Sequence, residues 1–329
     1  MLRLATNESP SGPFPAAVEA IAAHAGSVGR YPEPDAPLVA RLAERHGLRP
    51  DAIALGNGGD GIIGYLATAL LGPGDEVATA WPSFPTYVGD ARTAGASPVL
   101  TPLTADGAVD LDALAAAITP RTRLVWVCTP NNPTGATVDR DELAAFLDGV
   151  PEHVLVVVDE AYHEFTEGPG RIDAIAEHVR TRPNVGALRT FSKMYGLAGL
   201  RIGWFAGPPE VAERLRAVRH FYDVTDLAIA AALASVDDDA EVERRRAANR
   251  EQRGRLEAGL DALGIAHLPS ETNFVCAVVD DAPTVAARLA QQGILVRSLD
   301  DLGRPDLLRI TVGDEAAVDA VLAALTPRS

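Results

Sequence analysis

The sequence predicts an α/β protein, with a large domain built on a mostly parallel sheet sandwiched by helices and a smaller α+β domain. From residue 31 to residue 236, helical segments alternate with short β-branched runs, a pattern typical of parallel strands joined by crossover helices. After residue 236, a long charged helical segment leads into shorter strands. At roughly 150 residues per domain, the 329 residues accommodate about two domains. We expect residues 29–238 to form the large domain, and residues 1–28 with 239–329 to form the small one.

Seven apolar runs are the expected strands of the large domain. The clearest is VLVVV, directly before Asp159, because a parallel strand buried on both faces is continuously apolar. The seven runs are residues 52–55, 76–80, 97–100, 124–128, 154–159, 185–190 and 203–206. The helices expected between them include residues 61–71, 110–118 and 139–147, and Gly-Pro-Gly at 72–74 marks a turn.

The smaller domain is expected to begin with a long, solvated helix. After the acidic run DDDAE, Glu241 and Glu251 each precede an arginine by four residues, a spacing that stabilises an exposed helix. The strands expected beyond it lie near residues 273–279, 294–297 and 308–312, with a helix at 282–292. We expect about the first 28 residues to pack against this domain.

Composition excludes several classes of protein. Hydrophobic residues make up 47% of the chain, as in an ordinary soluble globule, and the net charge of −16 disfavours binding to nucleic acid or an anionic membrane. An anionic ligand therefore needs a local cationic cluster. Cys128 and Cys276 have no metal-site spacing, which predicts no metal, no disulfide framework and a reduced cytoplasmic location. No signal-peptide pattern follows Met1, and the longest apolar run, residues 227–236, is too short to span a membrane.

One residue type is almost absent. The chain has 28 arginines and a single lysine, Lys193. Arginine replaces lysine at most solvated positions, but it cannot supply a neutral, nucleophilic amine, because guanidinium stays protonated. Lys193 is therefore a candidate Schiff-base or general-base lysine.

Polar segments follow four of the expected strands. They are residues 56–61 (GNGGDG), 131–135 (NNPTG), 159–162 (DEAY) and 190–193 (TFSK). Ligands bind beyond the carboxyl ends of parallel strands, so we expect these segments to share one site. Together they provide an amine, a carboxylate, a phenol, an amide, hydroxyls and a glycine-rich helix start. Pyridoxal phosphate needs this set: a lysine for the imine, a carboxylate for the ring nitrogen, and backbone N–H groups with an arginine for the phosphate.

The segment TFSKMYGLAGLRIG, residues 190–203, resembles the cofactor-lysine signature of the fold-type I, class I/II aminotransferases. TNESPSGP near the start, RYPEP at 30–34, NNPTG, DEAYHEF and LRITVG resemble the histidinol-phosphate aminotransferase branch more narrowly. These matches run in order over nearly the whole chain. The resemblance implies an aspartate-aminotransferase-like large domain, pyridoxal 5′-phosphate as cofactor, and a cytoplasmic homodimer with shared active sites that serves amino-acid biosynthesis.

The resemblance also implies roles for residues around the cofactor ring. Lys193 would form the Schiff base and move a proton between the substrate α-carbon and the cofactor. Asp159 would pair with the ring nitrogen, and Asn132 and Tyr162 would hydrogen-bond the ring hydroxyl. Phe84 would stack on the ring.

For the cofactor phosphate, the resemblance implies binding by the backbone of Gly59 and Asp60 and by Thr190, Ser192 and Arg201. Tyr31 would reach the cofactor phosphate of the neighbouring subunit.

On the substrate, Arg309 would clamp the α-carboxylate, and Arg297 would meet a phosphate at the distal end. Asn7 belongs to the N-terminal segment that would fold over the site.

Two departures from the family pattern leave the amino donor open. Gly61 stands where an acidic residue is common, and Ser11 where an aromatic residue is common. Histidinol phosphate, an aromatic amino acid or a small amino acid are all candidate donors, with a 2-oxo acid such as 2-oxoglutarate as acceptor. A pyridoxal-phosphate-dependent decarboxylase of the threonine-phosphate type would use the same residues.

Two readings from other classes are weaker. The segment GNGGDG also fits the G-x-G-x-x-G pattern of a nicotinamide-dependent dehydrogenase, but Asp75 and Glu76 precede the next expected strand end, where that pattern needs its acidic residue. A catalytically silent binding protein would not need the full set of candidate site residues.

Overall fold

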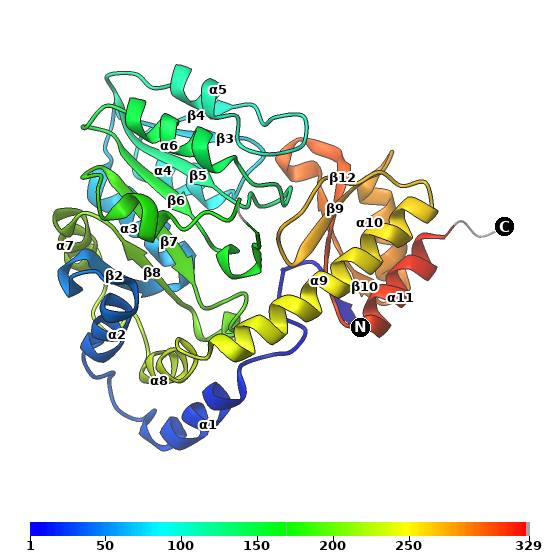
Figure 1. Cartoon of the computed structure of the whole chain (residues 1–329), viewed down its shortest axis with the longest axis horizontal. Helices are drawn as coiled ribbons and strands as arrows, with labels where there is room; N and C mark the ends of the chain where they lie inside the picture. The colour runs from blue at the N-terminus through cyan, green and yellow to red at the C-terminus, as the bar shows by residue number, and fades with distance from the viewer. Residues whose placement is uncertain (169, 327–329) are drawn as a thin grey trace.

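The computed structural model describes residues 1–168 and 170–326. A seven-stranded sheet forms the larger part of the molecule (Figure 1). Its strands are β2 (Ile53–Asn57), β3 (Glu76–Ala80), β4 (Ser97–Thr101), β5 (Thr122–Cys128), β6 (Leu155–Asp159), β7 (Val185–Thr190) and β8 (Ile202–Ala206), in the order β2-β8-β7-β6-β5-β3-β4. Only β8 runs antiparallel to its neighbours. The predicted α/β class and all seven predicted strands are confirmed, with ends shifted by at most two residues.

Helices cover both faces of this sheet. They are α2 (Ala36–His46), α3 (Gly58–Leu70), α4 (Thr86–Thr93), α5 (Leu111–Ala116), α6 (Arg140–Gly149), α7 (Pro209–Val218) and α8 (Asp226–Ser235). One core contains residues of α2, α5, α6 and α8, and the other contains residues of α3, α4 and α7. Strand β5 contributes to both, because Val125 and Val127 point to the first core while Leu124 and Trp126 point to the second.

A smaller unit follows the long helix α9 (Asp239–Ala262), which runs from the large sheet across to it (Figure 1). Strands β9 (Phe274–Val278), β11 (Arg297–Leu299) and β12 (Arg304–Thr311) form an antiparallel sheet in the order β11-β12-β9. Helices α10 (Ala282–Gln291) and α11 (Glu315–Leu325) share a core with the C-terminal half of α9. Short turns of 3₁₀ helix lie at 25–27, 50–52, 163–165, 198–200 and 300–302, and a π turn lies at 175–179.

The strand predicted at 294–297 is two strands. Residues Ile294–Leu295 form β10, which pairs in parallel with β1 (Leu2–Arg3), whereas β11 begins at Arg297 and pairs with β12. The apolar run gives no sign that its two halves have different partners.

The N-terminal segment contacts both units, which differs from the expectation that it packs against the smaller one. Strand β1 does join β10, but α1 (Pro15–His24) packs against α8 beside the large sheet. Helix α8, with the sequence DLAIAAALAS, is apolar around its circumference, so the face turned away from the sheet needs a cover. The proposed domain boundaries stay a prediction, although α1, which they assign to the small domain, packs against α8.

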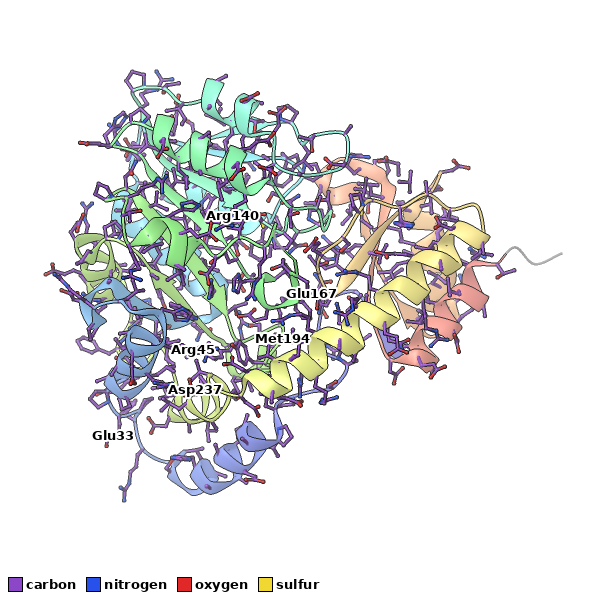
Figure 2. The ribbon with its side chains drawn as sticks, in the orientation of Figure 1. Glu33, Arg45, Arg140, Glu167, Met194 and Asp237 are labelled. Carbon is purple, nitrogen blue, oxygen red and sulfur yellow. The ribbon has the colours of Figure 1, made fainter. Side chains whose placement is uncertain are left out.

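Ion pairs join the elements around the start of α9. Arg45 on α2 lies 3.4 Å from Asp237, in the turn between α8 and α9, and the two side chains lie close together in Figure 2. Arg45 also pairs with Asp239, the first residue of α9. Among the residues that the structure describes, no helix is long and apolar enough to cross a membrane.

Candidate active site

A cavity of about 220 Å³ opens at the carboxyl ends of β5, β6 and β7, where the polar segments were expected to meet. Ten of the predicted site residues line it: Gly59, Asp60, Phe84, Asn132, Asp159, Tyr162, Thr190, Ser192, Lys193 and Arg201. Thr6 and Glu8 from the N-terminal segment also line it, and the sequence analysis missed both.

Lys193 lies in the loop after β7 with its amine inside this cavity. Its Nζ donates a hydrogen bond to the carbonyl oxygen of Thr6 at 3.2 Å and lies 5.9 Å from the centre of the Tyr162 ring. Burial and the nearby positive charges of Arg309 and Arg201 lower the pKa of the Lys193 amine to about 8, although Asp60 partly opposes them. A substantial fraction of this amine is therefore neutral, and so nucleophilic, at slightly alkaline pH.

The N-terminal segment passes directly over the lysine loop. Gly196 has a φ of +69°, and a Cβ at this position would lie 1.9 Å from the carbonyl oxygen of Gly12. Only glycine permits this approach, which places Gly12 and Pro13 against the loop that carries Lys193.

Asp159, at the end of β6, is 4% exposed. Its Oδ1 accepts a hydrogen bond from the backbone N–H of Ala161 at 2.9 Å, and its Oδ2 accepts one from the hydroxyl of Tyr87. Burial raises the pKa of the Asp159 carboxyl to about 6, with both hydrogen bonds acting against that rise. Tyr87 was not predicted, and the only signal was its position three residues after Phe84.

A polar cradle, formed by Arg201, Ser192 and the first turn of α3, lies at the N-terminus of α3. Gly58 has a φ of +74°, and a Cβ here would lie 2.3 Å from Nη2 of Arg201, so the arginine packs directly on the backbone of the first helical turn. That guanidinium donates to Oδ2 of Asp60 at 2.8 Å and to Oγ of Ser192 at 3.4 Å. A helix N-terminus, a hydroxyl and a guanidinium that converge in this way suit a phosphate group.

Hydrogen bonds connect the large sheet to the small one through Tyr162, Asn7, Asn132 and Arg309. The side-chain amide of Asn7 donates to the hydroxyl oxygen of Tyr162 at 2.8 Å. The Arg309 guanidinium, on β12, donates to Oδ1 of Asn132 and to the carbonyl oxygen of Ala5 at 2.6 Å. Nε of Arg309 is buried without a hydrogen-bond partner among the described residues. Asn7 and Arg309 thus contact Tyr162 and Asn132, which line the cavity, and their roles towards a substrate stay a prediction.

Arg297 and Tyr31, like Arg309 and Asn7, are not among the residues that line the cavity. Arg297 is opposite Arg309 in the sheet register, but its guanidinium pairs with Asp301. Tyr31 is 75% exposed and stacks on Tyr222 with ring centres 4.3 Å apart. Its predicted contact is with a second subunit, which the structure does not include.

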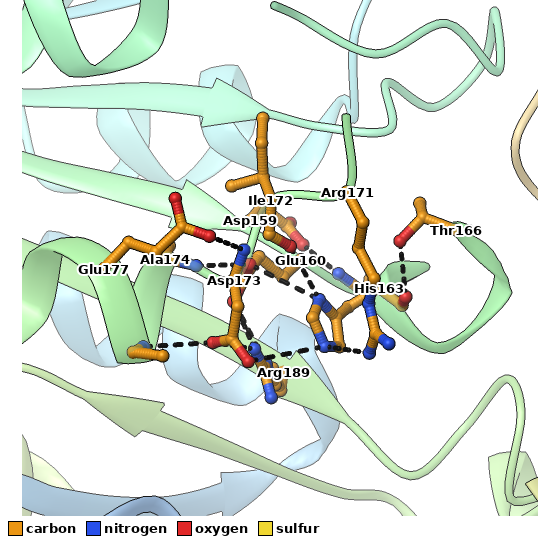
Figure 3. Close-up of polar contacts among 12 residues, drawn as sticks. Asp159, Glu160, His163, Thr166, Arg171, Ile172, Asp173, Ala174, Glu177 and Arg189 are labelled. Atoms are coloured by element: carbon orange, nitrogen blue, oxygen red, sulfur yellow. Dashed lines mark hydrogen bonds and ion pairs between the residues drawn. The ribbon is translucent and has the colours of Figure 1, made fainter. Parts of the chain in front are cut away.

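A buried ionic network lies behind the strand ends (Figure 3). Arg189 donates to Oε2 of Glu160 at 3.0 Å and to Oδ1 of Asp173 at 2.8 Å, and Oε1 of Glu160 accepts from the N–H of Ala174 at 2.8 Å. Burial disfavours the Glu160 carboxylate, yet Arg189 and His163 hold its pKa below the ordinary value. Glu160 directly follows Asp159, and Arg189 directly precedes Thr190, so the network fixes the ends of β6 and β7. The signal of this network in the sequence was Arg189, a charged residue inside the otherwise apolar strand β7.

Comparisons with known proteins agree with this geometry. Residues 1–325 match the family model described as aminotransferase class I and II. A histidinol-phosphate aminotransferase from Ruegeria sp. (strain TM1040) is 43% identical over 98% of this chain and 89% of its own length. An aromatic amino acid aminotransferase from Thermobifida fusca (strain YX) is 44% identical over 97% of this chain and 88% of its own. A crystal structure of histidinol-phosphate aminotransferase from Sinorhizobium meliloti in complex with pyridoxal-5′-phosphate superimposes with a TM-score of 0.90 at 31% identity, covering 98% of this chain and 89% of that one.

Proposed function

The chain belongs to the class I and II aminotransferase family, and we propose that its amino donor is histidinol phosphate and its acceptor a 2-oxo acid such as 2-oxoglutarate. It is a pyridoxal-phosphate-dependent aminotransferase. The observation that supports this chemistry is one cavity in which Lys193, Asp159 and Arg201 meet, with Arg309 bonded to Asn132 in its lining. The donor is supported by the histidinol-phosphate aminotransferase that is 43% identical to this chain.

The residues present fit pyridoxal phosphate. The cradle of the α3 N-terminus, Ser192 and Arg201 suits its phosphate, and the partly neutral amine of Lys193 suits its aldehyde. The buried carboxylate of Asp159 suits its ring nitrogen, because each oxygen accepts one hydrogen bond and keeps a further lone pair. The Asp60 carboxylate pairs with the Arg201 guanidinium, so a phosphate would compete with it for this cation, and Asp60 would contribute its backbone N–H rather than its side chain.

Pyridoxal phosphate, when bound, supplies a carbonyl that takes the amino group and a ring that withdraws electrons from the substrate α-carbon. Lys193 would move a proton at that α-carbon, because its amine has a pKa of about 8 and is the only lysine amine of the chain. Asp159 would keep the ring nitrogen protonated. Asn132 and Tyr162 would hydrogen-bond the ring hydroxyl, and Phe84 would cover the ring.

Arg309 would bind the α-carboxylate of the donor and of the 2-oxo acid. Its buried Nε without a partner and its fork geometry suit a bidentate carboxylate, which would compete with Asn132 and Ala5 for the guanidinium. Arg297 would turn from Asp301 towards a distal phosphate.

An aromatic amino acid is the second candidate donor. The Thermobifida fusca relative carries that name at 44% identity. Two features of this chain favour it: the ion pair between Arg297 and Asp301, and the small Ser11 in the N-terminal segment. The comparisons do not favour decarboxylation of a phosphorylated amino acid or nicotinamide-dependent hydride transfer, because the relatives cited are aminotransferases.

We also propose a cytoplasmic homodimer with shared sites. Tyr31, Tyr222 and Phe221 are 75%, 55% and 93% exposed and form one aromatic surface, which water solvates poorly. A second copy that covered this surface would bring Tyr31 to the cofactor phosphate of its partner.

The amino donor is tested by a half-reaction. The holoenzyme is mixed with histidinol phosphate, phenylalanine, tyrosine or alanine in the absence of a 2-oxo acid, and loss of the visible absorption band is followed. We expect histidinol phosphate to bleach the band fastest at equal concentration. Faster bleaching by phenylalanine or tyrosine would show that the amino donor is an aromatic amino acid and not histidinol phosphate. The Arg297→Gln variant distinguishes the two candidate donors, since it would slow the half-reaction with histidinol phosphate but not the half-reaction with an aromatic amino acid.

A further inference from the structure

Tyr87 is the one described side chain that hydrogen-bonds the carboxylate of Asp159. We propose that Tyr87 is a positioning residue of the active site: its hydroxyl holds Oδ2 of Asp159 and keeps that carboxylate ionised, so that the cofactor ring nitrogen stays protonated. This inference rests on the proposed function, because it concerns the group that Asp159 would face.

The position of Tyr87 is fixed by its ring. The residue is 1% exposed, on α4. Its ring stacks on Trp126 of β5 with centres 4.5 Å apart and planes 10° apart, and meets Phe84 edge-on at 5.8 Å. Both aromatic neighbours therefore restrict the ring, so little conformational entropy is lost when the hydroxyl bonds Asp159.

The charge around Asp159 explains why a donor is needed. Negative charge near Asp159 comes from Asp60, on α3, and from Glu160, the residue directly after β6. Burial also removes water from around the Asp159 carboxylate. The Cys128 thiol of β5 stays protonated, because burial and Asp159 raise its pKa to about 12. Two groups oppose protonation of Asp159: the hydroxyl of Tyr87 and the N–H of Ala161. The two cations that line the same cavity, Lys193 and Arg201, would both be engaged with the cofactor.

Tyr87 itself stays neutral. Burial and the Asp159 charge raise the pKa of its phenol well above the ordinary value, so the hydroxyl proton remains available to the carboxylate. Without that hydrogen bond, Asp159 would compete more strongly for the proton that it shares with the ring nitrogen. The proton would then move towards the carboxylate, and the ring would withdraw electrons less well.

The test measures the ring nitrogen directly. Tyr87→Phe removes one oxygen and keeps the ring between Trp126 and Phe84. Wild type and variant are loaded with ring-¹⁵N pyridoxal phosphate, and the ¹⁵N chemical shift is followed across the neutral pH range. We expect a protonated ring nitrogen in wild type, and in Tyr87→Phe a shift towards unprotonated pyridine that begins at lower pH. The matched control is Tyr65→Phe, which removes another tyrosine hydroxyl bonded to an aspartate, Asp223, and should behave as wild type.

A second variant keeps the test open if Tyr87→Phe does not fold. Site-specific 3-fluorotyrosine at position 87 keeps the ring and the hydroxyl but makes the phenol a stronger donor, so the ring nitrogen should hold its proton to higher pH. A ¹⁵N shift equal to wild type at every pH, in whichever of the two variants folds, would overturn the role of Tyr87 while leaving the cofactor assignment intact. Failure of the wild-type protein to bind pyridoxal phosphate would instead contradict the proposed function, so the two failures are distinguishable.

Discussion

Asn7 and Tyr162 are 155 residues apart in sequence, yet the amide of Asn7 donates a hydrogen bond to the Tyr162 hydroxyl at 2.8 Å. Because Tyr162 accepts from Asn7, its own proton remains free to be donated into the cavity. Thr311 donates to Oδ1 of Asn7 at 3.1 Å and accepts from its backbone N–H at 3.0 Å, which fixes the orientation of the amide. The N-terminal segment is thus part of the active site.

Replacing Asn7 should weaken cofactor binding. Asn7 has a φ of +57°, so Asn7→Gly removes the amide without adding backbone strain. Loss of one hydrogen bond, about 1 kcal/mol, predicts roughly fivefold weaker binding of pyridoxal phosphate, measured by equilibrium dialysis of the apoprotein. Ser9→Ala, in the same segment, is the control and should bind as wild type. Unchanged affinity in Asn7→Gly would show that the contact is dispensable.

Replacing Arg309 should raise KM for both substrates. Charge-assisted hydrogen bonds contribute about 1.5–3 kcal/mol, so Arg309→Gln should raise KM for the donor and the 2-oxo acid roughly 10- to 150-fold. Steady-state kinetics would measure this. Arg297→Gln should raise KM for the 2-oxo acid far less. Equal effects of the two substitutions on the 2-oxo acid would contradict the assignment of Arg309 to the α-carboxylate.

A side chain at Gly58 should loosen the phosphate cradle. Gly58→Ala places a methyl group against the Arg201 guanidinium, whereas Gly74→Ala shares the cost of a positive φ but has open space around its Cβ. Both variants should lose stability, by about 1–2 kcal/mol, in urea unfolding. Only Gly58→Ala should bind pyridoxal phosphate more weakly. Equal affinities would mean that Arg201 does not hold the phosphate.

Cofactor uptake should depend on pH through Lys193. The reactive form of this amine is neutral, and its pKa is lowered to about 8, so the uptake rate should rise with pH and level off above about pH 8. Stopped-flow absorbance on the apoprotein would follow the reaction. A plateau reached only above about pH 10, the range of an ordinary lysine, would show that the cavity does not perturb the amine.

Breaking the network behind the strand ends should destabilise the fold. Arg189→Met leaves the buried Glu160 and the partly exposed Asp173 without their cation, and an unpaired buried carboxylate typically costs about 3–5 kcal/mol. Urea denaturation would measure the loss, and Arg49→Met, which breaks a pair with Asp51 that is exposed on both sides, should be nearly neutral. A small effect of Arg189→Met would mean that water or rearranged side chains compensate the two carboxylates.

The sequence predicted the sheet and most of the cavity for a physical reason. Buried parallel strands are continuously apolar, and the polar residue that ends each run, such as Asp159 or Thr190, must lie at the ligand-binding edge. Contacts between distant segments were not predictable in this way. Nothing local to Tyr87 shows that its hydroxyl meets Asp159, and the apolar residues of α1 do not reveal that α8 is their partner.

The most direct test of the central claim uses the lone lysine. The protein is loaded with pyridoxal phosphate, reduced with borohydride, and the added pyridoxyl mass is located by peptide mapping. We predict a visible absorption band before reduction and an adduct on Lys193, with Lys193→Ala folded but unable to transfer an amino group. No band, an adduct only on the N-terminal amine, or wild-type turnover by Lys193→Ala would contradict the account.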